Sequence, residues 1–268
     1  MDQEICLLCE DSLEGILTGV YEAYRLKCIP EHTRLQIGEP GNYRLFTEYV
    51  NIETENEKAG KVIRTLQERF GVEAWIAIYR AASSYDQKKA DAIYHTIAKG
   101  LKCSRPSQLM GNLTDDAVRT VFELSRNVMN EAHHWKEFLR FEELENGILF
   151  AQIGPVNDIV AYLAPHFADR LPLENFMIYD EKRESLVLHP AGKDWYVRRL
   201  VKEDGEAKGN SLIDRQRIVY SENEAKYQEL FRYFCHRIAI KERKNVRLQQ
   251  GMCPLRFQSY MTEFKQLG

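Results

Sequence analysis

Apolar residues recur at helical spacing through most of the first half of the chain. After Asp11 and Ser12, either of which can cap a helix, they fall three or four positions apart as far as Lys27. Apolar or alternating runs predict strands over 4–10 and 43–53, with a loop at 30–42 between them. The helical spacing then returns and predicts four further helices, over 57–70, 72–85, 86–100 and 114–139.

Four residues are expected to mark the ends of these helices. Asp86 and Thr114 stand where the third and fourth begin, and their side chains can accept hydrogen bonds from free backbone N–H groups. Gly71 and Gly100 stand where the first and third are expected to end, because glycine commonly terminates helices.

Short alternating runs replace the helical spacing after Arg140. The runs 141–144 and 148–153 flank Asn146-Gly147, a dipeptide with a strong preference for tight hairpin turns. Further strands are predicted at 176–179, 185–189 and 194–200, and a helix after Asn157 must kink or restart at Pro165.

A last long helix is predicted to begin at Ser221, which has capping-box spacing to Glu224, and to run towards Asn245. Its apolar residues are expected to face inward: Tyr227, Leu230, Phe231, Phe234 and Ile238.

These patterns predict an α+β fold with a helical middle region, a small antiparallel sheet within 140–200, and a long C-terminal helix flanking them. The strand at 4–10 is a candidate to join that sheet. The change from helical spacing to short alternating runs after Arg140 suggests a subdivision of the chain into a mainly helical part, 1–139, and an α+β part, 140–268.

Composition narrows the function classes. A net charge of −3 gives the whole chain of 268 residues no general attraction to nucleic acid, so such a role needs a local basic patch. The sequence has no apolar run of 18 residues and no signal-peptide pattern at its start, so we expect a cytoplasmic protein without a membrane partner. Six cysteines are too few for a disulfide scaffold and fit a reduced compartment.

The sequence contains no motif that names a reaction. A phosphate-cradling glycine loop, GxSxG, HExxH and paired CxxC patterns are all missing, so no cofactor and no metal are predicted. Cys6 and Cys9 form a single CxxC, but an apolar strand would point their side chains to opposite faces. That placement argues against a metal or redox role for the pair.

Side chains able to do acid–base chemistry gather near the end of the long middle helix. Glu131 and His134 are three residues apart and share a helix face, with His133 beside them. Arg140 follows closely and could bind a phosphate or carboxylate through its guanidinium fork. The structural alternative is that histidines near a helix C-terminus are simply favoured by the helix dipole.

Asp158 and His166 complete the candidate catalytic set. They are about two helical turns apart, so they can line one surface if Pro165 does not break the helix. Histidine titrates near neutrality and suits proton transfer, although a histidine next to Phe167 can equally be a hydrogen-bonded core residue. We expect Arg140 and His166 to share a concave site in which Asp158 or Glu131 orients the imidazole.

A local excess of positive charge lies towards the C-terminus. Between Arg232 and Arg256 there are seven basic residues and one acidic residue, with aromatic residues interleaved. This pattern is typical of a nucleic-acid contact, and its alternative is a solvated helix face. The predicted nucleic-acid-binding residues are Arg237, Lys241, Arg243, Lys244 and Arg247.

Three segments of the chain resemble a bacterial family of DNA metabolism or DNA repair proteins whose reaction is not established. They are DSLEGILTGVYEAY, RFEELENGILFAQIGPVNDIVAYLAPHFADR and ERKNVRLQQGMCPLRFQSYMTE. The matching positions include Asp11, Gly15, Glu131, His133, Arg140, Phe141, Asp158, Pro165, His166, Phe167, Arg170, Asp180, Arg243, Asn245 and Glu263. The chain departs from the family pattern at Cys9-Glu10, where the family has an aromatic residue.

The resemblance spans nearly the whole chain and implies one family unit over 1–268. Related proteins are often encoded beside a radical SAM protein, and some are fused to a uracil-DNA-glycosylase-like domain. The resemblance therefore implies a DNA-associated protein of repair or base modification that acts with a partner enzyme. The alternatives are an enzyme, such as a hydrolase or nucleotide-processing enzyme, that uses the His/Arg/Asp set, and a non-catalytic protein–protein adaptor.

Overall fold

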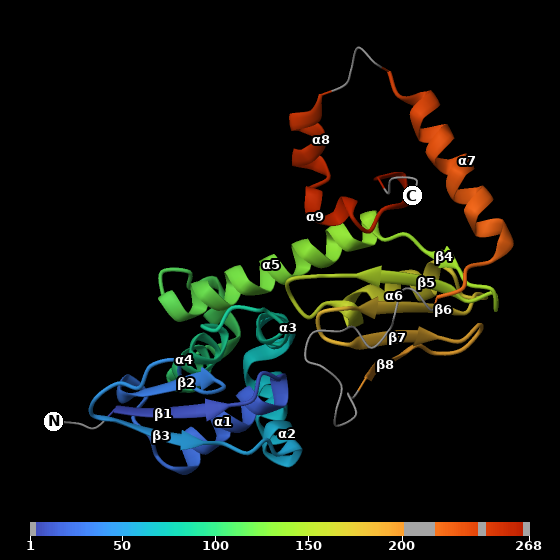
Figure 1. The fold of residues 1–268 in the computed structure, drawn as a ribbon. Coiled ribbons are helices and arrows are strands. Elements are labelled where there is room, and N and C mark those ends of the chain that lie inside the picture. The colour runs from blue at the N-terminus through green and yellow to red at the C-terminus, as the bar shows by residue number, and fades with distance from the viewer. Residues whose placement is uncertain (1–3, 201–217, 241–244, 265–268) are drawn as a thin grey trace. The chain divides into compact units, whose positions relative to one another are not determined.

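The computed structural model describes residues 4–200, 218–240 and 245–264, and the chain divides into two compact units, Met1–Asn130 and Glu131–Gly268. Each unit contains a β-sheet and helices, which confirms the predicted α+β class (Figure 1). The boundary between the units lies within the long helix α5, Asp116–Phe138. None of the helices in the described residues is both long and apolar enough to cross a membrane.

The sheet of the first unit consists of three parallel strands in the order β2-β1-β3. Their bounds are Glu4–Cys9 for β1, Thr33–Ile37 for β2 and Thr47–Asn51 for β3. The expectation that the first strand joins the later sheet is wrong, because β1 pairs with β2 and β3 instead. β2 lies in a segment expected to be a loop.

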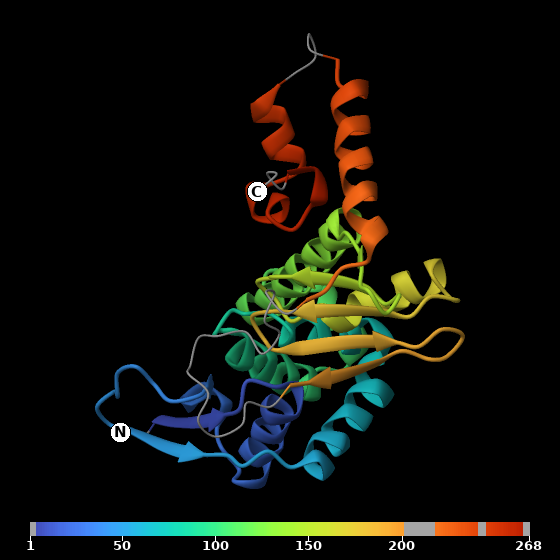
Figure 2. The ribbon, with the colours of Figure 1, turned by 45° about the vertical axis from the view of Figure 1, so that its right-hand side comes forward.

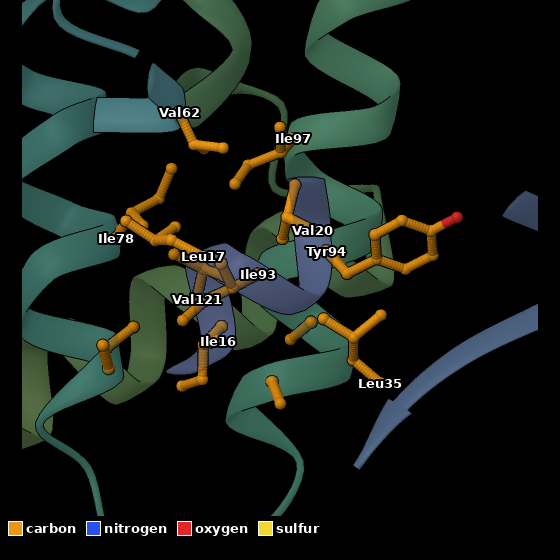
Figure 3. Close-up of a cluster of buried hydrophobic side chains, with 14 of the residues drawn as sticks. Ile16, Leu17, Val20, Leu35, Val62, Ile78, Ile93, Tyr94, Ile97 and Val121 are labelled. Carbon is orange, nitrogen blue, oxygen red and sulfur yellow. The ribbon is translucent and has the colours of Figure 1, made fainter. Parts of the chain in front are cut away.

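One face of this sheet packs against helix α1, Leu13–Arg25. Ser12 caps α1 as predicted, with its hydroxyl oxygen accepting from Gly15 N at 2.9 Å. The apolar side chains of β1, β2 and α1 then join those of the following helices in one buried cluster, part of which is shown in Figure 3: Ile16, Leu17, Val20, Leu35, Val62, Ile78, Ile93, Tyr94, Ile97 and Val121.

The other helices of the first unit are η1 Pro30–His32, α2 Asn56–Thr65, η2 Leu66–Phe70, α3 Gly71–Ala82, α4 Lys89–Lys102, η3 Pro106–Gly111 and the first part of α5. The helices predicted from the spacing are present, whereas η1 lies in the predicted loop and η3 in a segment with no predicted element. Three predicted helix ends are wrong. Lys88, not Asp86, is the N-cap residue of α4. Asp115, not Thr114, caps α5, because its carboxylate accepts from the N–H groups of Ala117 and Val118. Gly100 lies inside α4, where it is buried.

The sheet of the second unit has the strand order β4-β5-β6-β7-β8. The strands are β4 Glu142–Glu143, β5 Leu149–Ile153, β6 Phe176–Asp180, β7 Ser185–His189 and β8 Tyr196–Arg199. The hairpin at Asn146-Gly147 is confirmed by the antiparallel pairing of β4 with β5. The sheet is mixed, not antiparallel, because β5 and β6 run parallel. Helix α6, Val160–Arg170, connects them, as a parallel pair requires, and it continues through Pro165.

The C-terminal helix differs from its prediction in length and orientation. α7, Glu222–Ile238, ends before Asn245, which instead caps α8, Val246–Met252; α9, Leu255–Gln258, and η6, Thr262–Phe264, follow. The apolar side chains expected to face inward are exposed, with Tyr227 at 64%, Leu230 at 62% and Phe234 at 54% of full accessibility. Figures 1 and 2 both show α7 extending away from the sheet of its unit.

Polar contacts explain why the apolar side of α7 does not face the sheet. The Glu224 carboxylate accepts from Glu143 N at 2.9 Å, and the Gln228 amide donates to Glu142 Oε1 at 3.2 Å. The Ser221 hydroxyl oxygen caps the helix as predicted by accepting from Glu224 N. These bonds hold the polar side of α7 against β4, so the apolar residues remain on its solvent side.

Replacing Gly100 with alanine should destabilise the protein, although alanine favours helices. A Cβ at this position would overlap the Phe70 ring and lie 3.0 Å from Leu109 Cδ2. We expect a loss of about 1–3 kcal/mol from overpacking. Gly60→Ala in α2 is the matched control, because no atom lies within 4 Å of its Cβ, and it should gain about 0.5–1 kcal/mol. Thermal unfolding midpoints test both, and an unchanged midpoint for Gly100→Ala would contradict the packing argument.

Candidate functional site

A surface hollow of about 880 Å³ lies in the second unit between the end of α5, the start of the hairpin and α6. We call it the basic hollow, since basic side chains line much of it. Its lining residues are His133, Lys136, Glu137, Leu139, Arg140, Phe141, Leu149, His166, Phe167, Arg170 and Leu171. It brings together three of the predicted site residues: His133, Arg140 and His166.

Helical spacing places the polar lining residues on facing surfaces. His133, Lys136 and Glu137 fall at positions i, i+3 and i+4 of α5, so they share one face. His166 and Arg170 are four residues apart on α6 and share a face in the same way. The two helices thus present their charged and titratable groups to one space.

Aromatic side chains form the apolar wall of the basic hollow. The rings of Phe141 and Phe167 meet edge to face with centroids 5.2 Å apart, and Phe141 also contacts the buried Phe176 at 5.5 Å. Edge-to-face contacts of this kind fix ring positions as well as burying apolar area. The wall is therefore a packed part of the core that reaches the surface.

Arg140 is held in place by a set of hydrogen bonds. Its Nη1 donates to the carbonyl oxygens of Glu137 and Leu139 at 3.0 and 3.2 Å, and its Nη2 donates to Glu263 Oε1 at 2.7 Å. The ion pair with Glu263 offsets the charge of Arg140. The guanidinium thus links the end of α5 to Glu263 and also lines the hollow.

Lys136 and Arg170 carry the uncompensated positive charge of the basic hollow. Within the described part of the chain, neither side chain forms an ion pair. The one acidic lining residue, Glu137, has its Oε1 3.1 Å from His133 Nε2. Lys136 and Arg170 therefore line the hollow without an ion-pair partner, while the lining carboxylate of Glu137 is already paired with His133.

The charge environment of His166 favours its neutral form. Burial is the largest cause that lowers the pKa of His166, followed by the positive charges of Lys136 and Arg170, with Asp169 acting in the opposite direction. In the described residues no carboxylate is hydrogen-bonded to His166, and its ring contacts Phe167. A bound anion would offset the repulsion and raise the pKa of His166.

The two carboxylates expected to orient His166 are engaged elsewhere, so that expectation is wrong. Glu131 is buried and accepts from Val156 N at 2.9 Å, Asn157 N at 2.8 Å and the Asn157 side-chain amide at 2.7 Å. Asp158 Oδ2 lies 3.6 Å from an Nη atom of Arg199. Within the described residues, His166 therefore has no carboxylate that orients its imidazole; the imidazole–carboxylate pair in the hollow is His133 with Glu137.

His134 has an aromatic environment and does not line the basic hollow. Its ring stacks on Phe138 at 6.1 Å and meets Phe257 at 5.8 Å, beside the buried Trp135. These contacts fix α9 against α5 within the second unit. Aromatic packing thus accounts for the position of His134.

The predicted nucleic-acid-binding set is only partly covered by the structure. Lys241, Arg243 and Lys244 lie outside the described residues. Arg237 lies at the end of α7 with its guanidinium 5.5 Å from the Tyr233 ring centroid, and Arg247 is exposed on α8. Arg237 and Arg247 belong to separate helices, because the long helix predicted to run towards Asn245 ends at Ile238 and α8 begins at Val246.

The CxxC pair behaves as its strand position predicts. Cys9 belongs to the core cluster, whereas Cys6 lines a hollow on the opposite face of the sheet. Burial raises the pKa of the Cys9 thiol to about 12 and also raises that of Cys6, so neither is a thiolate at neutral pH. Across the described residues, no three His, Cys, Asp or Glu side chains come together as a metal site.

Sequence reasoning missed Lys136 as a site residue and noted Arg170 without assigning it a role in the site. Helical spacing could have found both, since Lys136 is three residues after His133 and Arg170 four after His166. A lysine or arginine on a helix is usually a solvated residue, so the sequence offered no reason to single out these two.

A family model described as a domain of unknown function, DUF4130, matches residues 87–263. No curated protein matches the chain. The matching solved structures include a chain described as the DHH domain of a member of a family of ribosomal proteins. It is 11% identical, with 69% of this chain and 73% of that chain covered and a TM-score of 0.28, a likeness that carries no functional argument.

Changing Glu131 to glutamine should destabilise the second unit. The amide would direct a donor at one of the three N–H groups that the carboxylate now accepts from. A loss of about 1–3 kcal/mol is expected for a buried group left with an unmatched donor. Glu137→Gln, on the exposed side of the same helix, should cost less than about 0.5 kcal/mol. Calorimetry of the two variants compares them, and equal unfolding temperatures would refute the role given to Glu131.

Proposed function

We propose that this chain, which belongs to the DUF4130 family, is a DNA-associated protein of repair or base modification whose second unit holds a nucleic-acid phosphate in the basic hollow. The observation that carries the proposal is the meeting of two free cations, Lys136 and Arg170, with the neutral His166 at one concave surface. The family resemblance of the sequence supplies DNA as the expected nucleic acid.

The shape and lining of the basic hollow suit a backbone contact. Its volume is within the range of small-ligand sites and can take a phosphate with its attached sugar. Lys136 and Arg170 can pair with phosphate oxygens, while Phe141 and Phe167 offer apolar surface to the sugar or base. Cations that contact phosphates position a strand without reading its sequence, so weak sequence preference is expected.

Binding is better supported than catalysis by the second unit alone. A general acid–base pair needs a titrating group held by an orienting partner, and for His166 the two expected partners, Glu131 and Asp158, are both engaged elsewhere. His133 has a partner in Glu137, but both side chains lie on the exposed side of α5. On this proposal the chemistry is carried out by a partner enzyme, for which the family resemblance suggests a radical SAM protein. The chain would then hold the DNA strand on which the partner acts.

A protein–protein adaptor is the second candidate, and α7 favours it. The helix exposes Tyr227, Leu230, Phe234 and Ile238 while its polar side bonds to β4. Exposed apolar patches of this kind often mark protein interaction sites. The same surface would serve the main proposal as the docking surface for the partner enzyme.

Removing both free cations should weaken DNA binding and its dependence on salt. Each phosphate contact contributes roughly −0.9 to the slope of log affinity against log salt concentration on duplex DNA and about −0.7 on single strands. Lys136→Gln combined with Arg170→Gln should therefore flatten the duplex slope by about two units. Fluorescence anisotropy with short single- and double-stranded DNA over a salt series measures the slope.

Lys182→Gln is the control for general charge loss, because Lys182 is exposed in the same unit and does not line the basic hollow. It should change the slope by less than the double variant does. If the double variant keeps the wild-type slope, the basic hollow does not contact DNA phosphates. Failure of the wild-type protein to bind either DNA form at low salt would leave the adaptor as the remaining candidate.

A further inference from the structure

The sheet of the first unit has one apolar face and one polar face. Leu7, Cys9 and Leu35 belong to the core cluster that α1 covers. In the register of the strands, Cys6 pairs with Arg34 on one side and Tyr49 on the other, so these three share the opposite face. Parallel sheets are usually covered by helices on both faces, so a polar second face calls for an explanation.

The connection from β2 to β3 explains why this face is open. Parallel strands are usually joined by a helical crossover, but residues 38–46 contain none. The loop comes to the polar face, where Tyr43 meets the Tyr49 ring edge to face at 4.9 Å and Arg44 N donates to the Tyr49 hydroxyl oxygen at 2.8 Å. A hollow of about 440 Å³ remains beside it, in the space that a crossover helix would otherwise fill.

The hollow beside this loop, here called the sheet-face hollow, has three cations in its lining. Arg34 comes from β2, Arg44 from the loop and Lys88 from the residue before α4. Within the described ranges none of the three is in an ion pair. Guanidinium and ammonium groups that are not held in ion pairs are suited to bind a phosphate group.

The same hollow also offers hydrogen-bond acceptors. Glu4, Gln36 and Glu39 line it, together with Asp91, whose carboxylate accepts from Leu35 N at 3.2 Å. A lining that holds both unpaired cations and carboxylate acceptors fits a ligand that has an anionic group and several hydrogen-bond donors. An inorganic anion would interact only with the cations of the lining.

The aromatic pair and the loop backbone add a third feature. Tyr49 lines the hollow, and Tyr43, which contacts it, is exposed, so the pair offers a surface on which a planar ring can stack. At the end of the loop, Phe46 has a φ of 63° and is exposed. A bulky residue with positive φ is strained, and such strain is often found at ligand sites.

We propose that the sheet-face hollow binds a nucleoside monophosphate. Arg34, Arg44 and Lys88 bind the phosphate, Glu4 and Glu39 accept from sugar hydroxyls or base amino groups, and Tyr49 contacts the base. The site lies in the first unit, apart from the residues proposed to hold DNA, and goes beyond that proposal. A volume of about 440 Å³ is large enough for one nucleotide.

Isothermal titration calorimetry of the full chain with adenosine monophosphate, adenosine and inorganic phosphate tests the proposal. The nucleotide should bind at least about tenfold more tightly than either fragment, since it alone uses both sets of groups. Arg34→Gln combined with Arg44→Gln should weaken nucleotide binding by at least about tenfold. Arg69→Gln, an exposed arginine of η2 that does not line the hollow, should bind as the wild type does.

Three results would overturn the proposal: no nucleotide binding, phosphate binding as tight as nucleotide binding, or a double variant that binds like the wild type. Equal unfolding temperatures for the double variant and Arg69→Gln show that lost binding is not lost folding. Amide NMR shifts of the wild-type protein on adding the nucleotide provide a check without mutation, and shifts found only outside 4–6, 34–49 and 87–91 would also contradict the site. DNA binding by the Lys136/Arg170 variant is a separate measurement, so the two proposals can fail independently.

Discussion

The arrangement of the basic hollow depends on one buried carboxylate. Glu131 of α5 accepts three hydrogen bonds from the segment that leads into α6, at Val156 and Asn157. The Arg183 guanidinium donates to the carbonyl oxygens of Pro155 and Val156. The segment is thus held by its N–H groups on one side and its carbonyl groups on the other. Because α6 carries His166 and Arg170 and α5 carries Lys136, this clamp sets how far apart the charges of the hollow lie.

The clamp also explains why Glu131 does not orient His166. A carboxylate that is buried and bonded to two backbone N–H groups is a structural acceptor, and it cannot also orient an imidazole. With Glu131 and Asp158 engaged, the hollow keeps a neutral histidine between two free cations, which is an arrangement for binding an anion. We therefore propose binding for the second unit and chemistry for a partner.

Predictions from the sequence were confirmed where a single short-range interaction determines the local structure. The hairpin at Asn146-Gly147 and the cap at Ser12 are examples, since turn preference and a single hydrogen bond determine them. Prediction failed where distant contacts decide: α7 places its apolar side outward because Glu224 and Gln228 bond to β4. For the candidate site, the short span that holds Arg140 and His166 led to the prediction that they share a site, and both line the basic hollow. The hydrogen-bond partners of Glu131 are 25 and 26 residues away from it and left no sequence pattern.

The central claim is that an anion binds between Lys136, Arg170 and His166. The pKa of the His166 imidazole reports on whether such an anion is bound. Proton NMR can follow the titration of His166 in the free protein and with a short DNA oligonucleotide, with the resonances of His95 in the first unit as an internal reference. In the free protein, burial and the two cations lower the pKa of His166. A bound phosphate would stabilise the protonated ring, so the pKa of His166 should rise on addition of DNA, with proton uptake as the pH falls through it. A pKa of His166 that stays the same at saturating DNA would contradict the account.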